Sequence, residues 1–224
     1  MHPADTSSID EVIATYNGCY PTRYAFYDDV DGVIGDHEEV ILRAQMEESP
    51  LCGAMEDALP ANTAPEEVSA EAFYGGAYFW PKRTLVFYSE KTTKRPMPYY
   101  DGATNKAFKP DDYKLLEAYW ESLEQDADNI SEEDKRYGYA GMFMTSICCD
   151  LKVIKLNETF HQLERFMCDD IRRCMILDWR ADLAPHCVEE HEYGACGGNY
   201  LWTVSCPVKR RVTLIRFHFN WYYA

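Results

Sequence analysis

The pattern between residues 215 and 221 places the strongest constraint on the fold. Large apolar side chains alternate there with polar ones, in the order Ile215, Arg216, Phe217, His218, Phe219, Asn220 and Trp221. A period of two is typical of a β-strand that buries one face. Because an exposed apolar strand near a chain end promotes aggregation, we expect this strand to lie on the core or against another subunit. It should pair with a second strand within residues 198–224, across a turn near Pro207.

An N-terminal helix is predicted from Ser8 to the residue before Gly18. Ser8 and Glu11 have the spacing of a capping box, and Gly18 ends the helical pattern. The apolar positions of this segment recur at helical spacing, at Ile9, Val12, Ile13 and Tyr16. One side of the helix is therefore apolar and needs a partner surface.

Helical and strand patterns both occur in the rest of the chain, which favours an α+β fold. Further helices are expected over residues 36–48 and 65–74. Another is expected to begin at Pro110, with a buried face made of Leu115, Leu116, Tyr119 and Leu123. A last one is expected to follow an N-cap at Asn157, with a buried face made of Phe160, Leu163, Met167, Ile171 and Cys174. Strands are expected over residues 19–27, 83–89, 97–100 and 139–156, with a hairpin turn at Asp31-Gly32. We predict an antiparallel β-sandwich decorated with helices, in which residues 1–18 form a helical arm and residues 19–224 one globular domain.

Charge and composition exclude several classes of protein. The formal net charge of −16 argues against a nucleic-acid partner, and the short basic cluster at 209–211 is interpreted as a solvated turn. No apolar run is long enough to span a membrane, and residues 1–10 lack the features of a signal peptide, so we expect a cytosolic protein. The nine cysteines are then expected to be free thiols, and the sequons at Asn129 and Asn157 to be chance matches.

No catalytic motif stands out, and we predict that the chain is not an enzyme and requires no cofactor. The best metal candidates are His186, Cys187, His191, Cys196 and Cys206, but their spacing fits no compact zinc knuckle. A nucleophilic cysteine beside His186 or His191 is a further alternative. Ordinary buried or surface thiols explain both sets more simply, so no metal site is predicted.

Tyrosine is the compositional outlier, with 17 residues in the chain. Its ring and hydroxyl suit protein interfaces as well as core positions. Thiols ionise near ~8.5 and phenols near ~10, so alkali makes an acidic chain more negative and should drive an assembly of it apart. The candidate contact and alkali-sensitive residues are Tyr20, Tyr24, Tyr27, Tyr99, Tyr100, Tyr137, Tyr139, Tyr222 and Tyr223, with Cys148 and Cys149.

Three patches resemble the polyhedrins of cypoviruses, which form the crystalline occlusion bodies of these insect viruses. The first is the segment 24–29 with Asp31-Gly32 close behind, and the second is 110–113 with Trp120-Glu121 following. The third patch comprises Cys168-Asp169, Cys174, Trp179 and Leu183, with an approximate match at 191–194. The middle of the chain is shortened against the family, and the aromatic tail after Tyr200 is longer than expected.

The resemblance implies a β-sandwich whose trimers pack into a dense lattice in the cytoplasm of the host cell. It implies that the N-terminal helix, with Ile9, Val12, Ile13 and Tyr16, ties trimers together, and that the lattice encloses virus particles until the alkaline larval midgut dissolves it. A bound nucleotide is left open, because the family's contacts cannot be transferred to named residues. The alternative is a β-sandwich or barrel that binds a small ligand, with the aromatic residues lining its cavity.

Overall fold

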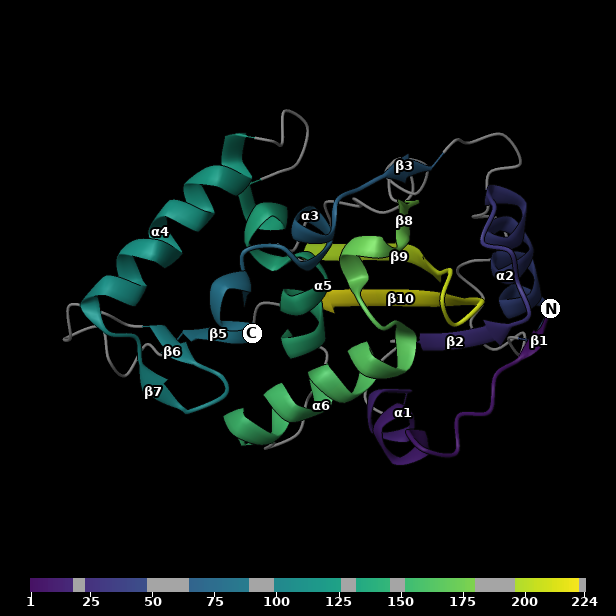
Figure 1. Ribbon diagram of the computed structural model, residues 1–224, viewed down its shortest axis with the longest axis horizontal. Coiled ribbons are helices and arrows are strands. Elements are labelled where there is room, and N and C mark those ends of the chain that lie inside the picture. The colour runs from purple at the N-terminus through teal and green to yellow at the C-terminus, as the bar shows by residue number, and fades with distance from the viewer. Residues whose placement is uncertain are drawn as a thin grey trace. The chain divides into compact units, whose positions relative to one another are not determined.

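The chain forms two compact units, each with helices and an antiparallel sheet. The computed structural model describes residues 1–17, 23–47, 65–88, 99–125, 132–145, 152–179 and 196–221. Residues 1–68 and 164–224 make up one unit, called here the split unit, and residues 69–163 make up the other, the inserted unit. The mixed α+β class predicted from the sequence is confirmed, with one sheet in each unit (Figure 1).

The sheet of the split unit has six strands. Their spatial order is β1 (His2–Pro3), β2 (Arg23–Asp28), β10 (Arg211–Trp221), β9 (Cys196–Cys206), β8 (Met175–Asp178) and β3 (Glu66–Glu67). The predicted strand pair is confirmed as the long β9–β10 hairpin, in which Val212 lies opposite Ser205. As expected, the alternating strand is covered by the core. Ile215 and Phe217 are buried, and so are Val212 and Leu214 at the positions of opposite parity, because β10 lies inside the sheet.

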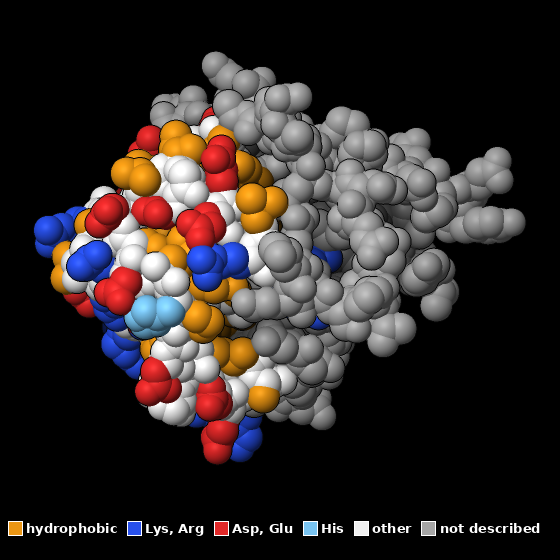
Figure 2. All heavy atoms as spheres, turned by 90° about the vertical axis from the view of Figure 1, so that its right-hand side faces the viewer, with side chains coloured by type: hydrophobic (Ala, Val, Ile, Leu, Met, Phe, Trp, Pro, Cys, Tyr) orange, Lys and Arg blue, Asp and Glu red, His pale blue; other side chains and the backbone are white. Residues whose placement is uncertain are grey.

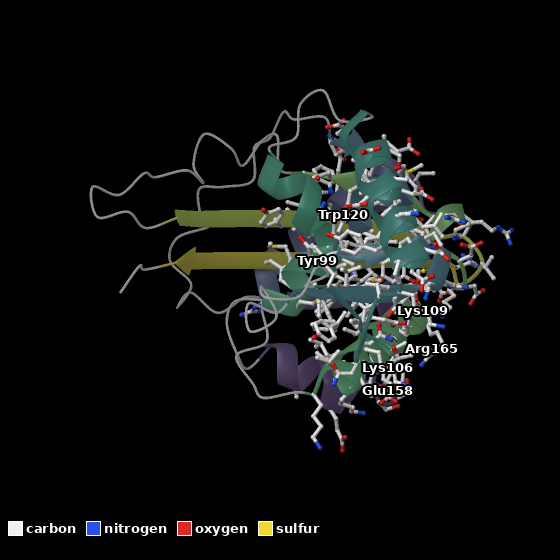
Figure 3. The ribbon with its side chains drawn as sticks, turned by 90° about the vertical axis from the view of Figure 1, so that its left-hand side faces the viewer. Tyr99, Lys106, Lys109, Trp120, Glu158 and Arg165 are labelled. Atoms are coloured by element: carbon white, nitrogen blue, oxygen red, sulfur yellow. The ribbon has the colours of Figure 1, made fainter. Side chains whose placement is uncertain are left out.

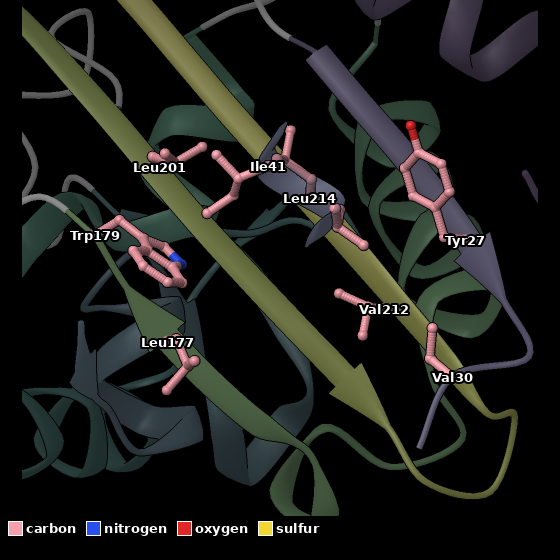
Figure 4. Packing of buried hydrophobic residues seen from close by; sticks show 9 residues of the cluster. Tyr27, Val30, Ile41, Leu177, Trp179, Leu201, Val212 and Leu214 are labelled. Carbon is pink, nitrogen blue, oxygen red and sulfur yellow. The ribbon is translucent and has the colours of Figure 1, made fainter. Parts of the chain in front are cut away.

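Helix α2 (Ile34–Glu47) packs on β9 and β10 of this sheet. Its buried residues Val40 and Ile41 join an aliphatic cluster that includes Leu177, Leu201 and Leu214 (Figure 4). The other helices of the split unit are α1 (Asp10–Asn17), the 3₁₀ turn η3 (Ile171–Arg173) and the end of α6 (Val153–Met167).

The hairpin turn predicted at Asp31-Gly32 is wrong, because the chain passes from β2 into a helix there. The Asp36 carboxylate accepts the backbone N–H groups of Asp31, Gly32 and Val33, at 3.0, 2.7 and 3.2 Å. These bonds hold the loop before α2, and Gly32 takes the positive φ of 77° that the bend requires. A short Asp-Gly signal is shared by helix entries and hairpins.

The inserted unit combines short strands with four α-helical segments and one 3₁₀ turn in the part of the chain that the structure describes. Its elements are α3 (Ala70–Tyr74), β4 (Tyr78–Phe79), η1 (Trp80–Lys82), β5 (Thr84–Tyr88), β6 (Tyr99–Asp101), β7 (Lys106–Ala107), α4 (Pro110–Gln125), α5 (Glu132–Thr145) and the first part of α6. The strands form one sheet in the order β4-β5-β6-β7. Over the described residues, neither this sheet nor the six-stranded one closes into a barrel.

Aromatic rings build much of the inserted unit's core. Phe160 is fully buried, and its ring centroid lies 5.4 Å from that of Tyr74, 5.5 Å from that of Tyr139 and 5.1 Å from that of Phe143. Tyr139 also stacks on Phe73, with the centroids 4.8 Å apart. Packing of this kind adds ring-to-ring attraction to the burial of apolar area.

A close backbone approach fixes the position of α5 against α3. Gly138 interrupts α5 with φ 40° and ψ −159°. A Cβ at this position would lie 2.7 Å from the backbone nitrogen of Gly75 and 2.8 Å from its Cα. Only glycine fits this contact without displacing backbone atoms.

Several predictions for this part of the chain are corrected. The strand predicted over 139–156 is wrong, because the described parts of that range belong to helices α5 and α6. Asn157 lies inside α6 instead of capping it, and its Oδ1 accepts the Leu85 N–H at 2.9 Å. Leu115 is 56% exposed although Leu116 is buried. The helix expected from Pro65 begins at Ala70, with Ser69 as its N-cap.

Candidate functional site

The predicted assembly helix corresponds to α1, which packs on β2 within the split unit. Ile9, directly before the helix, is only 3% exposed, so its side chain is used inside the chain. Val12 and Ile13 are half-buried and present part of their surface. The side chain of Tyr16 lies outside the described residues. The apolar face of α1 is therefore partly covered by the chain itself, and Val12 and Ile13 are its remaining contact candidates.

Tyrosine is mainly an interior residue in the part of the chain that the structure describes. Six of the ten described tyrosine side chains are buried, namely Tyr24, Tyr27, Tyr74, Tyr78, Tyr139 and Tyr200. The other four are half-buried, namely Tyr99, Tyr100, Tyr113 and Tyr119. Of the remaining candidates, Tyr20, Tyr222, Tyr223, Cys148 and Cys149 and the side chain of Tyr137 lie outside the described residues. The placement favours a role for tyrosine in the folded interior as well as at contacts.

A half-buried aromatic cluster joins β6 to α4 in the inserted unit (Figure 3). The Tyr99 ring meets the Trp120 ring edge to face, with the centroids 4.9 Å apart, and the Tyr113 ring lies 6.0 Å away. Trp120 donates its Nε1–H to the Gly76 carbonyl at 2.8 Å. Burial, with the nearby Glu117 carboxylate, raises the pKa of the Tyr113 hydroxyl. These rings are the described tyrosine candidates best placed for contact with another molecule.

A second exposed surface lies on and before α2. Val33, Ile34 and Leu42 are large apolar side chains that are each more than half exposed. Figure 2 shows that apolar side chains on this side of the molecule are interspersed with acidic and basic ones. Scattered apolar exposure of this kind is ordinary for a protein surface. It offers contact area of mixed polarity without a large apolar patch on the described part of this face.

The basic cluster at 209–211 has a structural role that the sequence did not predict. Lys209 Nζ donates to the carbonyls of Arg165 and Phe166, and Arg211 Nη1 donates to the Phe166 carbonyl at 2.7 Å. These carbonyls belong to the last turn of α6, where cations are favoured by the helix dipole. Arg211 also forms a two-point ion pair with Asp28, at 2.6 and 2.9 Å. The cluster therefore caps a helix, although Arg210 itself is exposed as expected of a solvated turn.

A buried polar network links α2 to the sheet. His37 Nδ1 lies 2.7 Å from Thr203 Oγ1, which accepts the Trp179 Nε1–H at 2.9 Å. The Thr203 hydroxyl either donates to His37 Nδ1 or accepts a second hydrogen bond from it, depending on the tautomer of the imidazole. Burial lowers the pKa of His37 to about 4, against the smaller raising effects of the Asp36 carboxylate and the Gly32 backbone.

Three thiols meet at the end of β8 and β9. Cys174 interacts with both Cys168 and Cys206, and its Sγ–H donates to the Asp170 carbonyl at 3.4 Å. Cys168 and Cys206 are buried, whereas Cys174 is half-buried. None of the three is in a disulfide, as predicted for these cysteines. Their convergence could not be read from the sequence, because 32 positions separate Cys174 from Cys206 and only the strand register brings them together.

The structure describes few of the candidate metal ligands. His186, Cys187 and His191 lie outside the described residues, as does the side chain of Cys196, whereas Cys206 belongs to the thiol cluster. Within the described ranges, no group of three or more His, Cys, Asp or Glu side chains is arranged to hold a metal ion. Asn157 of the second sequon is buried, so its side chain is inaccessible to glycosylation in the folded chain.

Comparison with known proteins identifies no relative. No family model matches the chain, and no curated protein or solved structure is significantly similar to it. Among the described helices, none is both long and apolar enough to cross a membrane.

Proposed function

We propose that this chain is a structural protein that assembles with copies of itself into a crystalline viral occlusion body. In this proposal the chain forms a β-sandwich with a projecting N-terminal helix, and its trimers pack into a lattice in the cytoplasm of an infected insect cell. The lattice encloses virus particles at neutral pH and dissolves in alkali. Neither catalysis nor a cofactor is part of the proposed role, and the resemblance to cypovirus polyhedrins is its starting point.

The observation that carries the proposal is the burial of tyrosine. All ten tyrosine side chains that the structure describes are buried or half-buried, so these alkali-sensitive groups lie in the packed interior or at its rim. A phenolate loses its hydration when buried, so alkali opposes folding as well as contact between chains. This gives dissolution a second cause beside charge repulsion between acidic surfaces.

The residues of the three patches that resemble polyhedrins lie at positions that support a structural role. Tyr27 and Trp179 belong to the aliphatic cluster of the split unit, and Asp28 holds Arg211. Cys168 and Cys174 belong to the thiol cluster. These residues stabilise the fold directly, as expected for a protein whose task is mechanical.

The edges of the six-stranded sheet support contacts through side chains. Both edge strands are only two residues long, and they carry Pro3 on one edge and Glu66 with Glu67 on the other. Short strands, proline and charge all discourage the addition of a foreign strand. A regular lattice needs defined contacts, and blocked edges disfavour disordered aggregation through the sheet.

The direct test is expression of the chain in insect cells, followed by electron microscopy and powder diffraction of the particles. We expect intracellular crystals that persist in neutral buffer and dissolve near pH ~10, where phenols ionise. A soluble monomer at high concentration, with no crystals, would contradict the proposal. Particles that survive strong alkali would remove the proposed switch.

A matched pair of variants tests the N-terminal helix. Ile13→Glu places a charge on the half-buried face of α1, and Ala14→Glu places the same charge on the neighbouring exposed position. We expect the first variant to abolish crystals and the second to retain them, with circular dichroism showing that both chains fold. Equal crystallisation of the two variants would show that α1 is not an assembly contact.

A further inference from the structure

The thiol cluster of the split unit has the geometry of a redox pair. Met175 lies opposite Ser205 at the end of the antiparallel β8–β9 ladder. Cys174 and Cys206 are the next residues outward from this last pair, one on each chain segment, and the Cys206 thiol is close enough to lower the pKa of Cys174. Directly opposite residues of an antiparallel pair have Cα atoms about 4.5–5.5 Å apart, which lies within the range that a disulfide needs.

Cys174 is the thiol of the cluster best placed to react. It is half-buried and so reachable from solvent, whereas Cys168 and Cys206 are buried. The Sγ–H of Cys174 donates to the Asp170 carbonyl at 3.4 Å, and that of Cys168 to the Glu164 carbonyl at 3.7 Å. The neighbouring thiols Cys168 and Cys206 lower the pKa of Cys174, whereas Cys174 raises that of Cys168. A thiolate stabilised in this way is the nucleophile in thiol–disulfide exchange.

Some charged groups near the thiol cluster oppose ionisation of a thiol, and another offsets that effect. The carboxylates of Asp169 and Asp170 oppose a negative charge on Cys174. Lys209 Nζ lies 3.6 Å from the Asp169 carboxylate and offsets part of that charge. Glu164 lies on the side of Cys168 and disfavours ionisation of that thiol. The arrangement therefore directs ionisation to Cys174 and leaves Cys168 protonated.

We propose that Cys174 and Cys206 form an oxidation-sensitive dithiol that a small disulfide, of the class of oxidised glutathione, converts into an intrachain disulfide. Cys168 stays reduced, with its Sγ–H donating to the Glu164 carbonyl. The site is a covalent modification site on the split unit, independent of the proposed occlusion-body function.

The reaction is two successive exchanges. The Cys174 thiolate attacks one sulfur of the small disulfide, which breaks its S–S bond, forms a mixed disulfide on Cys174 and releases one small thiolate that takes a proton from water. Cys206 then loses its proton to solvent and attacks Cys174 Sγ, which closes the intrachain bond and releases the second small thiol. The two thiols of the chain are oxidised by two electrons, and one small disulfide is reduced to two thiols.

The test treats the full chain with oxidised glutathione, traps remaining thiols with an alkylating agent, and maps the peptides by mass spectrometry. We expect a Cys174–Cys206 disulfide and an alkylated Cys168 in the folded chain. A Cys168–Cys174 disulfide, or Cys174 recovered fully alkylated, would overturn the proposal.

Variants separate the two steps. Cys206→Ser should stop after the first exchange and accumulate the glutathione adduct on Cys174, whereas Cys168→Ser should still close the Cys174–Cys206 disulfide. An adduct that is equally abundant in the unmodified chain and in Cys206→Ser would show that Cys206 does not resolve it. Peptide mapping of the unmodified chain decides the pairing even where a variant fails to fold.

Discussion

The two units of this chain are stabilised by different chemistry. The split unit is a six-stranded sheet with a largely aliphatic cluster against α2 and specific polar links, such as His37 to Thr203 and Arg211 to Asp28. The inserted unit has shorter strands, and its core is rich in stacked and edge-on rings around Phe160. The first depends on one neutral histidine and on charge pairing, and the second on the close fit of large rings.

The difference predicts that acid affects the two units differently. Acid charges the buried His37 imidazole, which belongs to the split unit. Buried tyrosines do not distinguish the units, because each has three of them among the described residues: Tyr24, Tyr27 and Tyr200 in the split unit, and Tyr74, Tyr78 and Tyr139 in the inserted unit. Substitutions that perturb one unit at a time, followed by hydrogen exchange resolved by segment, reveal whether the other unit responds.

The largest effect is expected from Phe160→Ala. The ring is fully buried among four other aromatic rings, so its loss should cost about 3–5 kcal/mol in the free energy of unfolding. Denaturant unfolding measures the loss, and exchange should accelerate mainly within residues 69–163. Leu115→Ala, at an exposed position in α4 of the same unit, should change the stability by less than about 0.5 kcal/mol. Similar losses in the two variants would show that the rings are not the core of this unit.

A pair of glycine substitutions contrasts the backbones of the two units. Gly138→Ala should cost about 2–4 kcal/mol, because the new Cβ meets the Gly75 backbone and φ is positive. Gly35→Ala in α2 has nothing within 4 Å of the new Cβ and should stabilise the chain by about 0.5 kcal/mol. Thermal unfolding measures both shifts, and effects of the same sign would contradict the packing of α5 on α3.

Acid should weaken the split unit through His37. Its pKa is lowered from the ordinary value of 6.5 to about 4 in the folded chain, so the unfolded chain binds the proton more readily. The stability is then full above pH 6.5 and is lost as the pH falls from 6.5 towards 4, by on the order of 3 kcal/mol. Urea unfolding at several pH values measures this slope.

His37→Leu should flatten that slope, because the titrating group is gone. His2→Gln is the control: its exposed imidazole has a raised pKa, so His2 gives stability that is present below pH 6.5 and lost as the pH rises. The acid-side loss should therefore persist in His2→Gln. An unchanged slope in His37→Leu would assign the loss to other groups.

The smallest effect is expected from Arg211→Lys. Lysine keeps the charge but cannot make the two-point pair with Asp28 while bonding the Phe166 carbonyl, so we expect a loss of about 1–2 kcal/mol. Arg210→Lys, at an exposed neighbour 3.7 Å from Asp31, should be neutral within about 0.5 kcal/mol. Equal effects in chemical denaturation would mean that the cap on α6 contributes little.

Strong local patterns predicted a good part of the fold. The alternation at 215–221 located β10, and apolar spacing located α4 and the buried face of α6 at Phe160, Leu163 and Met167. The failures occurred where tertiary contacts decide. Residues 139–145 contain Tyr139, Phe143 and Thr145, which favour a strand, yet Tyr139 and Phe143 have helical spacing and pack with Phe160.

The candidate site was harder to predict because its groups are distant in sequence. His37 and Thr203 are 166 positions apart, and no local spacing links them. Tyrosine abundance was visible in the sequence, but a tyrosine suits core and interface positions equally, so burial could not be assigned to Tyr74 or Tyr139. The pairing of Cys174 with Cys206 depends on the register of β8 and β9, which the sequence alone does not fix.

The position of β10 inside the sheet has a consequence for the order of events during synthesis. Asp28 of β2 is bonded to Arg211, 183 positions later, so β2 has no inner partner until the ribosome has made β10. The inserted unit, complete at residue 163, is translated earlier and can fold first. The sheet of the split unit is completed only after the insertion has been translated, so chains still on the ribosome lack a finished sheet.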